Sequence, residues 1–117
     1  MGSDVVIYHN PSCGTSRNTL ALLREKGVEP EVVEYLKAGW TKDQLKALFT
    51  RMGVTAREAM RVRGTNAEAL GLTAPDASDD AILEAMTREP ILVERPIVVT
   101  PKGAALCRPA ERALTLL

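Results

Sequence analysis

The hydrophobic pattern of the first 36 residues predicts a strand, a helix and a second strand. Residues 5–8 form a short apolar run typical of a buried strand, which ends at the turn-forming pair Asn10-Pro11. Apolar positions then follow helical spacing over residues 14–26, and a glycine comes next, as is common after a helix. Residues 31–36 are rich in β-branched side chains and predict a second strand. This order predicts a parallel βαβ unit.

The middle of the chain, about residues 41–89, has a helical pattern and no predicted strand. Capping boxes, in which a threonine is followed three residues later by Glu or Gln, precede short apolar segments at Thr41–Gln44, Thr55–Glu58 and Thr65–Glu68. A further helix is predicted from Asp79 to the residue before Pro90. This stretch is therefore predicted to be an insertion of several short helices.

The last part of the chain predicts a β-hairpin and a closing helix. Residues 96–100 and 104–107 flank the turn Pro101-Lys102-Gly103, and Pro109 suits the first turn of a terminal helix. The complete order is typical of an α/β protein with a thioredoxin-like mixed sheet and a helical insertion. We expect residues 1–117 to form a single domain of this kind.

Composition narrows the class of function. The 117 residues are 45% apolar and 26% charged, as expected of one globular core. Lys plus Arg equals Asp plus Glu at 15 each, so no basic excess indicates a nucleic-acid partner. No apolar run is long enough for a transmembrane helix or a signal-peptide core. We therefore expect a cytoplasmic protein whose two cysteines stay reduced.

The candidate chemistry lies at Cys13, between the first strand and the first helix. The free amides at a helix start stabilise a thiolate and bind anions, so the pKa of Cys13 is expected to be lowered. Gly14 allows close approach of a ligand, and Thr15 and Ser16 add donors. Arg17 is interpreted as a support for the loop or as a solvated residue rather than a ligand.

The spacing around Cys13 excludes two kinds of thiol enzyme. Ser16 stands where a dithiol oxidoreductase has its second cysteine, so no local thiol can resolve a disulfide. Thr19 stands where the loop of a tyrosine phosphatase needs arginine. A monothiol glutaredoxin fits the Cys-x-x-Ser pattern but leaves the arginines elsewhere in the chain unexplained.

Two motifs resemble the glutaredoxin-coupled arsenate reductases of bacteria. They are His9-Asn-Pro-Ser-Cys-Gly-Thr-Ser-Arg-Asn-Thr-Leu20, and Pro90-Ile-Leu-Val-Glu-Arg-Pro-Ile-Val-Val-Thr-Pro-Lys-Gly103 with the later Cys107-Arg108-Pro109. The resemblance implies that Cys13 is the nucleophile, that His9 helps to keep it deprotonated, and that an arginine triad holds the oxyanion. The triad is Arg61, Arg95 and Arg108. The resemblance also suggests a cis peptide bond between Arg95 and Pro96.

The resemblance implies a thiol-based reaction. The Cys13 thiolate attacks arsenate, glutathione as co-substrate converts the adduct to arsenite, and glutaredoxin clears the mixed disulfide. Metal ions and organic cofactors are not needed in this scheme. Cys107 is interpreted as a buried strand thiol without a required role.

Other interpretations remain open at the sequence level. Arg57, Arg61 and Arg63 would more commonly form a solvated face, and only the resemblance selects Arg61. A thioredoxin-like regulator that binds a protein such as RNA polymerase, without catalysis, is one alternative. A glutathione-dependent reductase for another substrate is the other.

Overall fold

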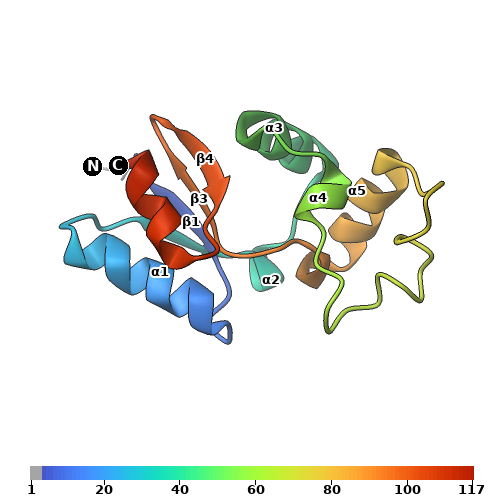
Figure 1. Ribbon diagram of the computed structural model, residues 1–117, viewed down its shortest axis with the longest axis horizontal. Coiled ribbons are helices and arrows are strands. Elements are labelled where there is room, and N and C mark those ends of the chain that lie inside the picture. Colours follow the sequence, from blue (N-terminus) through green and yellow to red (C-terminus); the bar gives the residue numbers. More distant parts are fainter. Residues whose placement is uncertain (1–3) are drawn as a thin grey trace. The chain divides into compact units, whose positions relative to one another are not determined.

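The computed structural model describes residues 4–117, and it divides into two compact units. The sheet unit comprises residues 4–38 and 95–117, and the helical unit comprises Gly39–Glu94. Figure 1 shows the strands in the first unit and most of the helices in the second. The first three residues of the predicted domain lie outside the described part.

The sheet unit is built on a mixed sheet with the strand order β2-β1-β3-β4. Its strands are β1 (Val6–His9), β2 (Glu31–Glu34), β3 (Ile97–Thr100) and β4 (Gly103–Leu106). The first strand pairs in parallel with β2 and antiparallel with β3, and β3 pairs antiparallel with β4. The predicted βαβ unit and hairpin are therefore confirmed, and the sheet has the predicted thioredoxin-like order (Figure 1).

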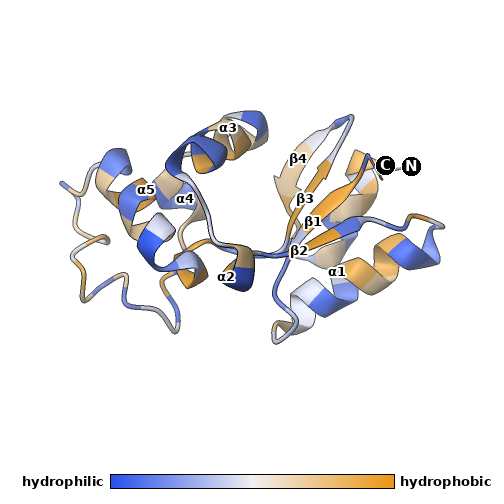
Figure 2. Cartoon of the chain, turned by 180° about the vertical axis from the view of Figure 1, so that it is seen from behind, coloured by the Kyte–Doolittle hydropathy of each residue, from blue (hydrophilic) through white to orange (hydrophobic). Residues whose placement is uncertain are grey.

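One face of this sheet is covered by α1 (Gly14–Glu25) and the 3-10 helix η2 (Ala110–Leu116), which lie side by side. Ile7 of β1 pairs with Val98 of β3, and both side chains are fully buried in this core. The core cluster contains Val5, Ile7, Leu23, Val98, Cys107 and Ala113. Figure 2 shows the corresponding hydrophobic character of β1 and β3. His9 follows Ile7 by two positions, so it lies on the same face, toward the start of α1.

Two predictions at the ends of elements in the sheet unit were wrong. The second strand ends at Glu34 rather than residue 36, because Tyr35–Ala38 forms the short helix α2 and buries Tyr35. Gly39 follows this turn with a φ of 76°, a conformation that favours glycine. The closing helix is of the 3-10 type, and Pro109 is its N-cap residue rather than part of its first turn.

The helical unit contains α3 (Lys42–Met52), α4 (Ala56–Ala59), α5 (Asp79–Arg88) and the 3-10 turn η1 (Pro90–Leu92). Two of the predicted capping boxes are confirmed. Thr41 accepts from the Gln44 amide at 3.1 Å, and Thr55 accepts from the Glu58 amide at 3.1 Å. Leu45, Phe49, Ile82 and Met86 form much of the buried interior between α3 and α5.

The helix start predicted from the third capping box was wrong, because no helix begins at Thr65. Its hydroxyl donates to the Arg61 carbonyl at 2.8 Å and accepts from the Ala67 amide at 3.2 Å. Gly64 and Gly71 adopt positive φ angles, so residues 61–78 form a series of turns instead. None of the helices in residues 4–117 has the length and apolar character needed to cross a membrane.

Candidate active site at Cys13

The candidate site begins in the loop between β1 and α1, where Cys13 is the N-cap residue of the helix. The Cys13 amide donates to the Asn10 carbonyl at 3.0 Å, which closes a tight turn containing Pro11. The Cys13 carbonyl then accepts from the Arg17 amide at 3.0 Å, as the first bond of α1. The side chain of Cys13 is 9% exposed, so the thiol is shielded but still accessible.

The surroundings of the sulfur lower the pKa of Cys13 to about 7 from its ordinary value of 9.0. Burial alone would raise this pKa, since it disfavours the charged thiolate. The Ser16 backbone N–H and the side chains of Arg95 and Arg108 favour the thiolate and outweigh that effect, with the positive charge of Arg95 adding to them. The predicted lowering of the pKa is confirmed, so the thiolate is accessible at neutral pH.

One arginine of the sheet unit contacts the sulfur, and a second helps to position the first. Arg108 Nη1 lies 3.7 Å from Cys13 Sγ and also donates to the Arg95 carbonyl at 3.0 Å. The Arg95 backbone thus helps to position the Arg108 side chain. The expected cis bond between Arg95 and Pro96 is confirmed, and a second, unpredicted cis bond joins Arg108 to Pro109.

Arg95 keeps unused donors at this place. Its Nε and Nη1 atoms are buried and have no hydrogen-bond partner among residues 4–117. Buried polar groups are normally paired, and unpaired guanidinium donors beside a thiolate are suited to binding an anion. The arrangement therefore combines a nucleophile with donors for an oxyanion.

His9 contacts Ser16, which lies in the first turn of the helix that Cys13 caps. The distance between His9 Nδ1 and Ser16 Oγ is 2.6 Å. Burial lowers the pKa of His9, with Arg24 and Arg17 acting in the same direction and Glu34 opposing them. The imidazole is therefore neutral at pH 7 and acts as a hydrogen-bonding group there. Its predicted role toward Cys13 stays a prediction.

Several predicted residues lie at the start of α1 without a direct part in these contacts. Gly14 opens the helix, and a Cβ atom there would meet only Arg17 Nη2, at 3.8 Å. Thr15 is half-buried, and its carbonyl accepts from the Thr19 hydroxyl at 2.8 Å. Arg17 Nη1 donates to the Pro11 carbonyl at 2.9 Å, which confirms its interpretation as a support for the loop.

Arg61 belongs to the helical unit, whereas the other two arginines of the predicted triad belong to the sheet unit. Arg61 Nη1 forms an ion pair with Glu94 at 2.9 Å, and its Nε donates to the Arg63 carbonyl at 3.1 Å. Arg57 instead donates to the carbonyls of Ala74 and Ala77, each at 2.9 Å. Arg57 and Arg61 therefore have separate side-chain contacts and do not form one solvated face, whereas Arg63 is exposed.

Cys107 is fully buried beside the end of β4, and both cysteines are free. Burial raises the pKa of Cys107 to about 11, with Arg112 and the Val98 backbone opposing the shift. Its thiol is therefore protonated at neutral pH. The prediction that Cys107 is a buried thiol is confirmed. No group of three or more His, Cys, Asp or Glu side chains within residues 4–117 is placed to hold a metal ion.

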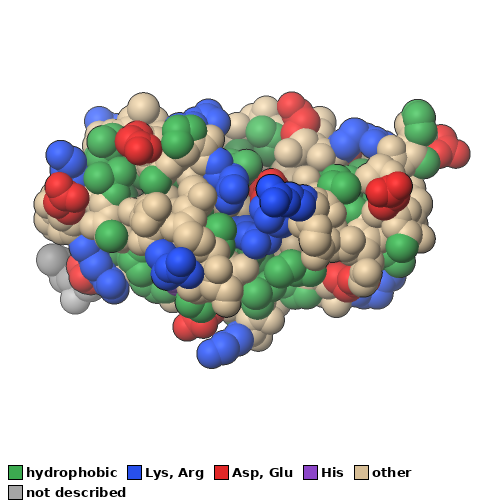
Figure 3. Space-filling model, turned by 60° about the horizontal axis from the view of Figure 1, so that its bottom comes forward, with side chains coloured by type: hydrophobic (Ala, Val, Ile, Leu, Met, Phe, Trp, Pro, Cys, Tyr) green, Lys and Arg blue, Asp and Glu red, His purple; other side chains and the backbone are tan. Residues whose placement is uncertain are grey.

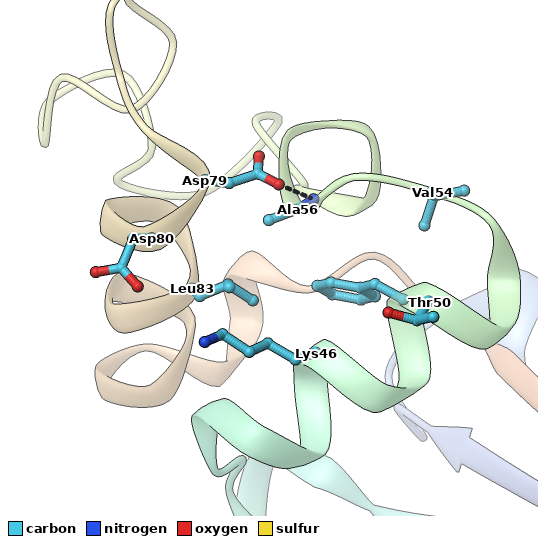
Figure 4. A pocket seen from close by; sticks show the side chains of 8 residues that line it. Lys46, Thr50, Val54, Ala56, Asp79, Asp80 and Leu83 are labelled. Atoms are coloured by element: carbon cyan, nitrogen blue, oxygen red, sulfur yellow. Dashed lines mark hydrogen bonds between the residues drawn. The ribbon is translucent and has the colours of Figure 1, made fainter.

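The helical unit contains a cavity of its own. A cavity of about 410 Å³ in the helical unit is lined by Lys46, Phe49, Thr50, Val54, Ala56, Asp79, Asp80 and Leu83 (Figure 4). Asp79 is engaged there with the Ala56 amide at 3.5 Å, and the lining contains no nucleophilic thiol. Figure 3 shows basic and acidic side chains interspersed on the face drawn.

The sequence analysis identified Asn10 as a turn residue but did not include it among the residues of the candidate site. It is 3% exposed, and its backbone and side chain bond to three residues of the Cys13 loop. The available signal was the Asn-Pro pair, because asparagine before proline commonly starts a turn stabilised by its own side chain.

Comparisons with known proteins agree over almost the whole chain. A family model described as the ArsC family matches residues 8–116. The arsenate reductase of Rhizobium meliloti (strain 1021) is 52% identical over 113 residues, which are 97% of this chain and 81% of that protein. The arsenate reductase of Escherichia coli (strain K12) is 46% identical over 115 residues, which are 98% of this chain and 82% of that protein. The solved structure of an arsenate reductase from Vibrio cholerae matches with a TM-score of 0.94 and 42% identity, covering 100% of both chains. The similarity thus includes both units and the mixed α/β fold.

Proposed function

Because the chain belongs to the ArsC family, we propose that it is an oxidoreductase that reduces arsenate to arsenite through an adduct on Cys13. Glutathione and glutaredoxin supply the electrons in this proposal. The family resemblance predicted from the two motifs is confirmed by the family match and by relatives at about half identity.

The observation that carries the proposal is the meeting of an ionisable thiol with arginine donors. Cys13 has a pKa of about 7, Arg108 contacts its sulfur, and Arg95 holds two buried N–H groups without a partner. Arsenate is a tetrahedral oxyanion, and guanidinium groups bind such anions with permanent charge and forked donors. A thiolate surrounded by these donors is suited to attack the arsenic atom of a bound arsenate.

The reaction then proceeds by thiol exchange. The Cys13 sulfur forms a bond to arsenic(V), and one arsenate oxygen leaves as water after taking up protons. The glutathione thiol attacks the Cys13 sulfur, and the electron pair of the sulfur–arsenic bond leaves with arsenic, which becomes arsenic(III) as arsenite. Glutaredoxin accepts the glutathionyl group and frees Cys13. Thiols carry both electrons, so this scheme requires neither a metal ion nor an organic cofactor.

Arg61 is proposed as a third arginine for the oxyanion, and Gly14, Thr15 and Ser16 as further binding residues. Support for Arg61 comes from the family resemblance, and its half-buried ion pair with Glu94 keeps the guanidinium ordered.

His9 is proposed to support the thiolate through Ser16, given the 2.6 Å contact between the two side chains. A cytoplasmic location fits the proposal, because glutathione and reduced thiols are abundant there.

The test is arsenate-dependent oxidation of NADPH with glutathione, glutaredoxin and glutathione reductase, each omitted in turn. Turnover should need arsenate, glutathione and glutaredoxin, because Ser16 leaves Cys13 without a local resolving thiol. Cys13→Ser should abolish the reaction, and Cys107→Ser should retain most of it. Equal loss in both variants would indicate an intramolecular disulfide relay. An equal rate with thioredoxin alone would show that the proposed coupling is wrong.

A further inference from the structure

We propose that Asn10 is a positioning residue for Cys13, because its side-chain oxygen holds the loop in the form that places the sulfur 3.7 Å from Arg108 Nη1. The inference rests on the proposed function only in taking Cys13 as the reacting thiol.

Asn10 lies at the junction of the first strand and the loop, and it forms three hydrogen bonds with residues of the loop. Its carbonyl accepts from the Cys13 amide at 3.0 Å, and its own amide donates to Ser16 Oγ at 3.0 Å. Its side-chain Oδ1 accepts from the Ser12 amide at 2.9 Å. One residue that is 3% exposed thus sets the positions of Ser12, Cys13 and Ser16.

The two backbone bonds of Asn10 tie the ends of the loop to the network around the sulfur. The bond to Cys13 closes the turn, and the bond to Ser16 fixes the hydroxyl that also contacts His9 at 2.6 Å. The loop held in this way places the Cys13 sulfur 3.7 Å from Arg108 Nη1. Displacing the turn therefore changes the contact that favours the thiolate.

The side-chain bond is the part that a substitution can remove. An asparagine oxygen that accepts from the amide two residues later mimics a backbone turn and restrains the intervening residues. Ser12 is exposed, so water replaces the lost partner of its amide without leaving a buried unpaired group. Loss of the side chain should therefore loosen the loop more than it destabilises the fold.

Three substitutions separate positioning from charge and from general stability. Asn10→Ala removes the acceptor. Asn10→Ser keeps a shorter acceptor that forms similar but weaker turns. Asn10→Asp keeps the acceptor and adds a negative charge near the thiolate, which should raise the pKa of Cys13 even with an intact turn. The matched control is Asn18→Ala, because Asn18 is exposed on α1.

The experiment is a pH titration of the Cys13 thiolate, by ultraviolet absorbance and by the rate of iodoacetamide alkylation, in a Cys107→Ser background without arsenate. Asn10→Ala should be alkylated about two- to fivefold more slowly near pH 7 and recover at higher pH, since it has less thiolate. Asn10→Ser should lie between Asn10→Ala and the parent, and Asn18→Ala should match the parent. Thermal melting is measured on the same proteins.

A parent-like pH profile in Asn10→Ala would overturn the inference. So would equal profiles in Asn10→Ala and Asn10→Ser that follow only their loss of melting temperature, since that pattern indicates a structural role. If Asn10→Ala does not fold, Asn10→Ser is compared with the parent and Asn18→Ala, and a parent-like pH profile in Asn10→Ser then overturns the inference. Because the titration contains no arsenate, its failure is distinguishable from failure of the proposed arsenate reduction.

Discussion

At the scale of single residues, the two cysteines show how surroundings decide thiol reactivity. Both are buried side chains, yet the pKa of Cys13 is about 7 and that of Cys107 is about 11. Burial raises the pKa of both thiols, but Cys107 is the more deeply buried of the two. At Cys13 the Ser16 backbone, Arg95 and Arg108 outweigh burial, whereas at Cys107 the opposing effects of Arg112 and the Val98 backbone do not. The difference between the two pKa values therefore comes from burial together with donors and charge.

Arg95→Ala and Arg108→Ala should each lower kcat/KM for arsenate by roughly ten- to over a hundredfold. A hydrogen bond from a guanidinium to a charged group contributes about 1.5–3 kcal/mol, which corresponds to this range. Lysine should rescue only part of the activity, because it keeps the charge and loses the forked donors. Steady-state kinetics of the variants measures the effect.

The control for the arginines is Arg24→Ala, whose side chain forms an exposed ion pair with Glu29 at the far end of α1. This variant should reduce arsenate like the parent. If Arg95→Ala and Arg108→Ala do the same, the assignment of the oxyanion site is wrong.

The titration of Cys13 should also make stability depend on pH. Its pKa in the folded chain is about 7, below the ordinary 9.0, so the folded state favours the thiolate more than the unfolded state does. This contribution is therefore complete above about pH 9 and is lost as the pH falls through about 7. The unfolding free energy of the parent, minus that of Cys13→Ser, should be larger at about pH 9.5 than at about pH 6.

Urea denaturation at both pH values tests this linkage. Cys107 is present in both proteins, so its own titration cancels in the difference. A pH-independent difference would contradict the lowered pKa of Cys13.

At the scale of elements, local sequence patterns correctly predicted the helix N-termini that depend on hydrogen bonds within one turn. Thr41 and Thr55 cap their helices as their sequences indicate, because the partner amide lies three residues away. Thr65 has the same pattern but bonds to the Arg61 carbonyl behind it, and glycines with positive φ interrupt the following segment. The Thr-x-x-Glu pattern does not show that the threonine hydroxyl will bond to a carbonyl four residues earlier.

Thr41→Ala should reduce the unfolding free energy by about 1 kcal/mol, because it removes one half of a complete capping box. Its kcat/KM should stay unchanged, since the cap serves α3, which carries none of the proposed site residues. Thr73→Ala, at an exposed turn position, is the control and should change neither quantity. Urea denaturation with activity assays checks both, and unchanged stability in Thr41→Ala would show that this cap contributes nothing.

At the scale of the whole molecule, the predicted site residues are distributed over both units. Arg61 and Glu94 form a half-buried ion pair within the helical unit, and Cys13, Arg95 and Arg108 lie in the sheet unit. The proposed role of Arg61 in binding the oxyanion is tested by substitution.

Arg61→Ala should therefore lower kcat/KM for arsenate about tenfold or more, by loss of a charge-assisted bond. Glu94→Ala should have a smaller effect, because Glu94 acts by holding Arg61. In the double variant the loss should equal that of Arg61→Ala alone, as a double-mutant cycle measures. Additive losses would show that Glu94 acts independently of Arg61.

Much of the fold follows from the sequence, whereas the site depends on contacts between distant residues. Cys13 was recognisable as a candidate nucleophile because neighbouring residues in the sequence predict the loop and the helix start that surround it. Arg108 lies 95 positions from Cys13, and Arg61 lies 33 positions from Glu94, so no local pattern indicates these pairs. The resemblance of the motifs selected the arginines, and the contacts of Arg108 with the sulfur and with the Arg95 carbonyl became visible only in three dimensions.

The central claim, that Cys13 carries the reaction with glutathione, is tested most directly by mass spectrometry after a single turnover without glutaredoxin. The protein is mixed with arsenate and glutathione, and the peptides and the arsenite released are quantified. The account predicts one glutathionyl group on Cys13 for each arsenite formed, with Cys107 unmodified. Arsenite formation without glutathionylation of Cys13, or with the group on Cys107, would contradict it.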